Sequence, residues 1–194
     1  MFNGIIKNTG KIISIKKKHN NCTFSIFSKM KFSRNEIGSS ISCSGACLTL
    51  VGFSKSVSKY YLSKETIDRT NFKNSRKKDL INLEKSIKYG ARISGHFVQG
   101  HVDTTCIVNK INIIGKSWFI HISLLKKHRR FVVEKGSIAI NGVSLTISNI
   151  FKKEFQIVVI PQTLKYTNLI SLKKKDVVNV EFDMFGKYIN NSLK

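Results

Sequence analysis

Short stretches in which apolar and polar residues alternate recur along the whole chain. Residues 23–27 (TFSIF) and 178–182 (VNVEF) alternate with a period of two, as strands with one buried face do. Residues 118–122 and 155–160 are rich in β-branched and aromatic side chains, which also favours strands. We expect about six strands in each half of the chain. That density is typical of a small closed barrel, because closure leaves no exposed sheet edge.

Only the end of the chain has apolar residues at helical spacing. A helix over residues 184–194 would place on one side the residues Met184, Phe185, Tyr188, Ile189 and Leu193. A helix this short needs a surface on which to pack its apolar side. A neighbouring subunit is one candidate for that surface.

The two halves of the chain are copies of one unit. Identical residues 97 positions apart are Gly45/Gly142, Leu48/Leu145, Thr49/Thr146, Thr66/Thr163, Thr70/Thr167, Asn71/Asn168, Asp79/Asp176, Asn82/Asn179 and Glu84/Glu181. Near the start of each half the spacing is 96, as in Gly4 and Gly100. The sequence therefore predicts an all-β protein of two tandem six-stranded barrels, residues 1–96 and 97–183, followed by the helix 184–194.

The charge of the chain is strongly positive. Lys and Arg number 34 against 11 Asp and Glu, a net charge of +23, and 28 of the 34 are Lys. The lysine runs carry no interleaved aromatic residues, which favours a solvated surface over a nucleic-acid groove. A nucleic-acid-binding barrel remains the alternative, and it predicts steeply salt-dependent binding to DNA or RNA.

The cysteines and the absence of long apolar segments indicate the compartment. Cys22, Cys43, Cys47 and Cys106 form no C-x-x-C pair, so we expect reduced thiols and no metal site. No stretch approaches the ~18 consecutive apolar residues of a membrane helix, and residues 1–7 do not resemble a signal peptide. We expect a cytoplasmic protein with no membrane or nucleic-acid partner.

Two duplicated motifs are candidates for a binding site. Residues 44–49 (SGACLT) and 141–146 (NGVSLT) each predict a tight turn entering a strand, with Cys47 and Thr49, or Ser144 and Thr146, on one face. Residues 64–66 (KET) and 161–163 (PQT) form the second pair, whose main-chain groups could read the edge of a heterocycle. From spacing alone, ordinary strand residues and capped turns explain both motifs equally well.

A third motif breaks the symmetry of the halves. Residues 95–103 (GHFVQGHVD) carry two histidines five positions apart, which do not share a strand face. His101 follows a glycine where the first copy has Ile5. That difference makes His101 a candidate for acid–base chemistry.

Taken together and in this order, these motifs resemble those of the riboflavin synthase family of duplicated lumazine-binding proteins. The resemblance rests on the start MFxGII, the CLT and SLT motifs, residues 95–103, KGSI at 135–138, the Glu65-Thr66 and Thr70-Asn71 pairs, and the ending 183–188. It implies two Greek-key barrels and a homotrimer held partly by the terminal helix. It also implies dismutation of two molecules of 6,7-dimethyl-8-ribityllumazine to riboflavin and 5-amino-6-ribitylaminouracil, with no metal or other cofactor.

The resemblance also carries over site residues. The first pocket is expected to use Gly4, Ile5, Ile6, Cys47, Leu48, Thr49, Tyr61, Leu62, Ser63, Lys64, Glu65 and Thr66. The second is expected to use Gly100, His101, Val102, Ser144, Leu145, Thr146, Val158, Val159, Ile160, Pro161, Gln162 and Thr163. Phe2 is expected to stack on a ring, and Lys135 to reach in from a neighbouring subunit. The catalytic candidates are His101, Ser144, Cys47 and Thr146.

The chain departs from the family pattern at two positions. Asn141 stands where family members often have Asp, and Ser44 replaces the usual Asn. An amide cannot take a proton, so a carboxylate base at position 141 is lost. A catalytically silent lumazine- or flavin-binding relative is therefore the second hypothesis.

Overall fold

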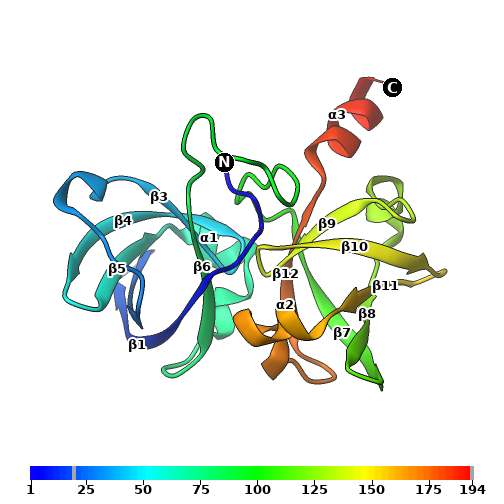
Figure 1. The fold of residues 1–194 in the computed structure, drawn as a ribbon, viewed down its shortest axis with the longest axis horizontal. Helices are drawn as coiled ribbons and strands as arrows, with labels where there is room; N and C mark the ends of the chain where they lie inside the picture. The colour runs from blue at the N-terminus through cyan, green and yellow to red at the C-terminus, as the bar shows by residue number, and fades with distance from the viewer. Residues whose placement is uncertain (19–20, 193–194) are drawn as a thin grey trace.

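The computed structural model describes residues 1–18 and 21–192 and contains two closed antiparallel barrels lying side by side (Figure 1). The strands of the first barrel are β1 (Asn8–Lys18), β2 (Asn21–Ser28), β3 (Ser40–Cys43), β4 (Ala46–Ser54), β5 (Val57–Leu62) and β6 (Leu80–Lys85). They pair in the order β1-β2-β5-β4-β3-β6. Six strands per half and an all-β fold are thus confirmed.

The second barrel repeats the topology of the first. Its strands are β7 (Thr104–Ile114), β8 (Ser117–Ser123), β9 (Ser137–Ile140), β10 (Val143–Ile150), β11 (Glu154–Val159) and β12 (Val177–Phe182). Their order around the barrel matches that of β1 to β6, strand for strand. Each barrel has its own apolar core, around Phe24, Leu50 and Tyr60 in the first and around Ile120 and Phe155 in the second.

The structure has more helix than the sequence indicates. α1 (Lys64–Arg69) and α2 (Pro161–Tyr166) contain six residues each. They are too short for a helical apolar period to show in the sequence, so the expectation that only the C-terminus forms a helix was wrong. Each leads into a 3₁₀ helix, η2 (Asn71–Asn74) or η4 (Asn168–Ser171); two others are η1 (Arg34–Glu36) and η3 (Lys126–Phe131).

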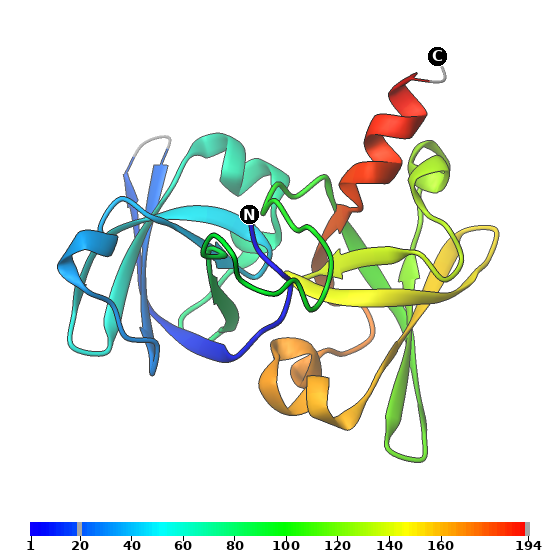
Figure 2. The same ribbon diagram turned by 45° about the horizontal axis from the view of Figure 1, so that its top comes forward.

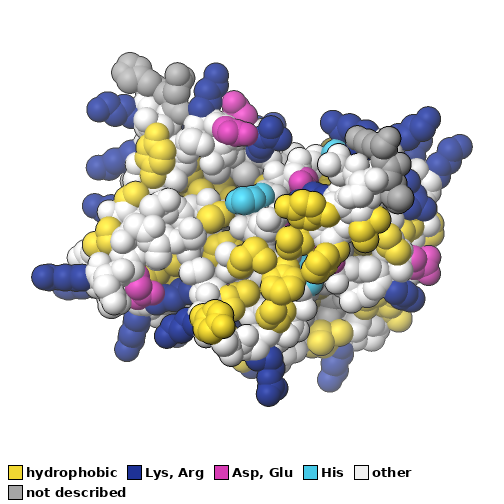
Figure 3. Space-filling view, turned by 90° about the horizontal axis from the view of Figure 1, so that it is seen from above, with side chains coloured by type: hydrophobic (Ala, Val, Ile, Leu, Met, Phe, Trp, Pro, Cys, Tyr) yellow, Lys and Arg dark blue, Asp and Glu magenta, His cyan; other side chains and the backbone are white. Residues whose placement is uncertain are grey.

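The expected terminal helix is present as α3 (Met184–Ser192), which rises away from the second barrel (Figure 1). Its apolar residues Phe185, Tyr188 and Ile189 are each more than half exposed. Leu193 lies outside the described residues. Apolar side chains gather in the middle of the face seen from above, with Lys and Arg around its margin (Figure 3). No helix in the described part of the chain is long and apolar enough to cross a membrane.

The two segments that open the halves lie between the barrels and pair with each other. Phe2 and Val98 form an antiparallel bridge, with both N–H groups donating to the opposite carbonyl at 2.7 and 3.1 Å. The segment before β7 runs over the top of the molecule beside the N-terminus (Figure 2). Each segment crosses to the other half: Ile6 is part of the second barrel's core, and Val102 packs on the core of the first.

The barrels also touch at their two glycine turns. A Cβ on Gly45 would lie 2.7 Å from the backbone nitrogen of Gly142, and a Cβ on Gly142 would lie 2.6 Å from that of Gly45. Both residues have positive φ, at 84° and 76°, as does the residue before each. Two consecutive residues with positive φ are characteristic of the tight hairpin turn that the sequence predicted.

Asn141 lies in this contact rather than in a pocket. Its side chain is buried, its Oδ1 accepts the N–H of Asn179 at 2.9 Å, and its carbonyl accepts from the side chain of Asn82 at 2.9 Å. Ser44 is buried at the equivalent turn and accepts from Asn168. The residue at position 141 therefore helps to hold the barrels together.

Candidate functional site

Two pockets occupy equivalent places on the two barrels. The Cys47 pocket, of about 430 Å³, is lined by Ala46, Cys47, Glu65, Thr66, Arg69, Thr70, Gly100, His101, Val102 and Asp103. The Ser144 pocket, of about 490 Å³, is lined by Val143, Ser144, Gln162, Thr163, Tyr166, Thr167, Gly4, Ile5, Ile6 and Lys7. Each residue of one pocket has its counterpart 97 or 96 positions away in the other. Both volumes are in the range of small-molecule sites.

The segment that opens each half of the chain contributes to the pocket on the other barrel. The N–H of Cys47 donates to the carbonyl of Gly100 at 2.7 Å, and that of Ser144 donates to the carbonyl of Gly4 at 2.8 Å. The grouping expected from the sequence, with Gly4 beside Cys47 and Gly100 beside Ser144, was therefore wrong. Both pockets are built from both halves of the chain.

Glycine is required at these crossings. Gly100 has a φ of 80°, and a Cβ there would lie 2.7 Å from the Cβ of Cys47. Gly4 has a φ of 70°, and a Cβ there would lie 2.7 Å from the Cβ of Ser144. A side chain would force each segment off the strand that it covers.

The floor of each pocket follows from strand alternation. On β4, Cys47 is partly exposed and Thr49 is exposed, whereas Leu48 points into the barrel core. On β10, Ser144, Thr146 and Leu145 repeat the arrangement. The expected common face is confirmed, although the two threonines lie further along the strands than the residues lining the pockets.

One wall of each pocket is a short helix, α1 or α2. The Ser63 hydroxyl accepts the N–H of Thr66 at 3.1 Å at the start of α1. Pro161 is the first residue of α2, where its missing N–H costs no hydrogen bond. The capped turn is confirmed at residues 64–66, whereas α2 has no side-chain cap. The two turns place Thr66 and Thr163 in the linings, and the reading of a heterocycle edge by their main-chain groups stays a prediction.

The two pockets differ in chemistry at five equivalent positions. His101, Asp103, Glu65, Arg69 and Cys47 in one are replaced by Ile5, Lys7, Gln162, Tyr166 and Ser144 in the other. The Cys47 pocket thus carries charged and titratable groups, including the Arg69–Glu65 ion pair at 3.0 Å. The Ser144 pocket has an aliphatic and an aromatic wall.

His96 adds a titratable group beside the Ser144 pocket. Its Nδ1 lies 2.7 Å from the hydroxyl of Ser144. Burial lowers the pKa of His96, and the nearby carboxylate of Asp183 opposes this shift. A neutral imidazole can accept the serine proton, so the pair is suited to moving a proton at this hydroxyl. Gly95 makes the contact possible, because a Cβ there would lie 2.8 Å from the serine oxygen.

Several residues expected in the site lie elsewhere. Phe2 is fully buried and packs with Val98 and Ala139, with Cys47 against them, so no face of its ring is free for stacking. Leu48, Leu62, Leu145 and Val159 fill the barrel cores. The linings of the two pockets also lack Thr49, Tyr61, Ser63, Lys64, Thr146, Val158, Ile160 and Pro161. Lys135, with a φ of 64°, donates to the carbonyl of Ser148 at 3.4 Å and lines neither pocket.

Five residues of the site were not predicted from the sequence: His96, Arg69, Asp103, Lys7 and Tyr166. Arg69 and Tyr166 lie one turn after Glu65 and Gln162 on their helices, a spacing that marks a common face once the helices are recognised. The comparison of the halves began at Gly4 and Gly100, so it did not include His96.

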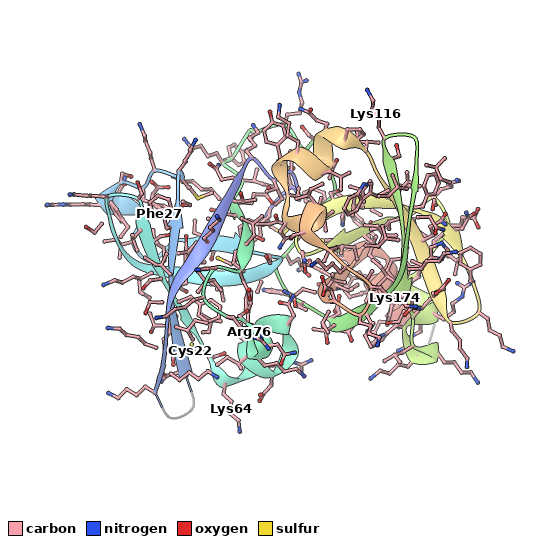
Figure 4. The ribbon with its side chains drawn as sticks, turned by 90° about the horizontal axis from the view of Figure 1, so that it is seen from below. Cys22, Phe27, Lys64, Arg76, Lys116 and Lys174 are labelled. Carbon is pink, nitrogen blue, oxygen red and sulfur yellow. The ribbon has the colours of Figure 1, made fainter. Side chains whose placement is uncertain are left out.

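The positive charge is not concentrated in the pockets. Lys64 on α1 and Lys116 on the β7–β8 turn point away from the body on opposite sides of the molecule (Figure 4). This spread fits the interpretation of the lysines as solvated surface. The expected absence of a nucleic-acid partner stays a prediction.

Comparison with known proteins assigns both halves to the same domain type. The family described as Lumazine binding domain matches residues 3–86 and 99–183. Proteins named riboflavin synthase are similar over the full chain: that of Actinobacillus pleuropneumoniae is 35% identical, covering 100% of this chain and 90% of the relative. That of Bacillus subtilis is 33% identical, covering 97% and 88%.

Solved structures of LumP have the same fold. The complex with riboflavin superposes with a TM-score of 0.84 at 25% identity, covering 94% of this chain and 99% of the other. The complex with 6,7-dimethyl-8-(1'-D-ribityl) lumazine has a TM-score of 0.80 at 25% identity, covering 93% and 98%.

Proposed function

The chain belongs to the lumazine-binding family of riboflavin synthases, and we propose that it catalyses the dismutation of two molecules of 6,7-dimethyl-8-ribityllumazine. One molecule transfers a four-carbon unit to the other, giving riboflavin and 5-amino-6-ribitylaminouracil. The two products contain all the atoms of the two substrates, so the reaction balances without an external oxidant or reductant.

The observation that carries the proposal is a pair of equivalent but unlike pockets on one chain. A reaction between two identical molecules gains most from two like binding sites that hold them in register. It also treats the two molecules differently, since one gives carbon and the other receives it. Different side chains at equivalent positions meet that requirement.

The chemistry needs proton transfer rather than a strong nucleophile. The C7 methyl group of the substrate is acidic, because its anion delocalises into the ring system. His101 at the Cys47 pocket and the Ser144–His96 pair at the other are the groups that we assign to this proton transfer. Cys47 has a positioning role in this scheme, because a neutral thiol is a poor nucleophile.

We also propose that the working site lies between subunits of a homotrimer, with the Cys47 pocket of one chain facing the Ser144 pocket of another. The exposed apolar residues of α3 support such an assembly. Lys135, exposed on the turn before β9, would then reach into the site of the neighbouring chain. The four cysteines are free, which agrees with a cytoplasmic location.

The test is incubation of the purified protein with 6,7-dimethyl-8-ribityllumazine alone, with riboflavin followed by absorbance and chromatography. One riboflavin for every two lumazines consumed is the expected result. Tight binding without product would identify a silent binding protein, the function that LumP's complexes favour as the second candidate. Asn141 gives no support to that candidate, because it lines neither the Cys47 nor the Ser144 pocket.

A further inference from the structure

Two buried glutamates occupy equivalent positions near the ends of β6 and β12. Glu181 is only 3% exposed, and Glu84 is partly buried. Neither lines the Cys47 or the Ser144 pocket. Each nevertheless contacts the segment that crosses to the pocket of the other barrel.

The carboxylates receive a series of main-chain hydrogen bonds. Glu181 Oε1 accepts the N–H of Gln99 at 2.6 Å, and its Oε2 accepts those of Gly100 at 2.9 Å and His101 at 3.1 Å. Glu84 Oε1 accepts the N–H of Asn3 at 2.8 Å, and its Oε2 accepts that of Gly4 at 3.0 Å. These bonds fix consecutive peptide groups of each crossing segment.

The other side of each segment is held by a pocket. The Gly100 carbonyl accepts from Cys47, and the Gly4 carbonyl accepts from Ser144. Each segment is thus held from two sides. A glutamate of one barrel accepts its N–H groups, and a pocket residue of the other barrel donates to its glycine carbonyl. The residue after each glycine, His101 or Ile5, is placed as a pocket wall by this two-sided attachment.

Burial of these carboxylates has a cost. It raises the pKa of Glu84, and it raises the pKa of Glu181 to about 7. The charged groups near Glu181 are Lys187 of α3, which lowers its pKa, and Asp103, which raises it; these two form an ion pair at 3.0 Å. Burial thus disfavours the charged form of both carboxylates, and the main-chain hydrogen bonds from the segments offset part of that cost.

We propose that Glu181 is a positioning residue that fixes His101 at the Cys47 pocket, and that Glu84 fixes Ile5 at the Ser144 pocket in the same way. The two glutamates act crosswise, each on the pocket of the barrel to which it does not belong. The inference rests on the proposed function only in naming His101 as a catalytic group.

Cys47 provides a reporter for one pocket alone. It is partly exposed beneath Gly100, whereas Cys22, Cys43 and Cys106 are buried. The experiment measures alkylation of each cysteine by iodoacetamide, by mass spectrometry, in the wild type, Glu181→Gln and the matched control Glu84→Gln. Rates are taken over a range of pH, so that a change in thiolate fraction is separated from a change in access.

We expect Glu181→Gln to speed alkylation of Cys47 about tenfold or more, the factor expected for loss of one hydrogen bond to a charged group. The amide nitrogen of Gln cannot accept an N–H, so at least one peptide group of the segment is released. Glu84→Gln should leave the Cys47 rate unchanged. Turnover should fall in both variants, because both pockets take part in the reaction.

An unchanged Cys47 rate in folded Glu181→Gln would overturn the proposal. Equal acceleration in both variants, or acceleration at all four cysteines, would also overturn it, because either result indicates general loosening. A second measurement needs no variant: amide hydrogen exchange at residues 99–101 in the wild type should be slow. Fast exchange there contradicts the proposal even if Glu181→Gln fails to fold. Neither alkylation nor hydrogen exchange depends on catalysis. Absence of riboflavin formation would therefore contradict the proposed function without contradicting the positioning role of the glutamates.

Discussion

The hydroxyl of Ser144 and the Nδ1 atom of His96 lie 2.7 Å apart, although one belongs to β10 and the other to the segment between the barrels. The equivalent residue of the other pocket is Cys47, and the histidine of that pocket is His101, which belongs to its lining. The proton-transfer machinery of the two pockets is therefore different. His101 lines the Cys47 pocket, whereas His96 contacts the Ser144 hydroxyl without lining the Ser144 pocket.

Replacing His96 with Ala should slow riboflavin formation by roughly 100-fold, the usual loss when an acid–base partner is removed. Binding of riboflavin, followed by fluorescence, should change little, because His96 is not among the residues that line the pocket. The Ser144→Ala variant and the double variant are the controls. If the two residues act as a pair, the double variant is hardly slower than either single one. Losses that multiply in the double variant would show that the residues act independently.

Glu181 should make the folded protein less stable as the pH rises. Its folded pKa of about 7 lies above the ordinary value of 4.5 for a glutamate, so between these values the folded state holds a proton that the unfolded state has lost. The contribution of Glu181 to the free energy of unfolding is complete below about pH 4.5. It is lost as the pH rises past 7, a change of roughly 3 kcal/mol. Glu84 acts in the same direction. Urea unfolding from pH 5 to 8 measures the slope. It should flatten in Glu181→Gln and persist in Glu134→Gln, whose glutamate is exposed; the same slope in both would refute the assignment.

Gly142→Ala should destabilise the protein by about 2 kcal/mol or more. The new Cβ would meet the backbone of Gly45 at 2.6 Å, and the φ of 76° is unfavourable for any other residue. Gly52→Ala is the control, because a Cβ at Gly52 meets no atom within 4 Å. Thermal unfolding compares the two. A Gly142→Ala melting temperature as high as that of Gly52→Ala would mean that the turns separate easily.

Deletion of residues 185–194 should weaken the proposed trimer. It removes the exposed apolar residues of α3 and also Lys187, whose ammonium donates to Asp103 beside the Cys47 pocket. Sedimentation velocity should show the truncated chain as smaller species at concentrations where the full chain is assembled. A truncated chain that still sediments as a trimer would exclude α3 from the interface.

The sequence was most informative where a feature repeats. Alternation identified the strands because one face of each strand is buried, and nine identical pairs revealed the duplication. The crossing of residues 1–7 and 97–103 could not be predicted. The equivalence of Gly4 and Gly100 predicts that the two segments have the same structural role. It does not predict which barrel each segment packs against. Only the contacts of Ile6 and Val102 decide that question.

Individual roles were harder to predict than equivalences. The family resemblance led to the expectation that Phe2 stacks on a ring, yet Phe2 pairs with Val98 and is completely buried. Asn141 looked like a lost catalytic base, although its turn lies against the other barrel. Both depend on long-range packing, which local pattern does not contain.

The central claim is that one chain carries two unlike halves of a bimolecular site, which meet between subunits. His101→Ala impairs the Cys47 pocket, and Ser144→Ala impairs the other. Each variant alone should be slow, whereas mixed assemblies of the two should recover activity, because the intact Cys47 pocket of one variant meets the intact Ser144 pocket of the other. Riboflavin formation after unfolding and joint refolding, with mixed assemblies verified by native mass spectrometry, measures this directly. Verified mixed assemblies as slow as either variant alone would contradict the account.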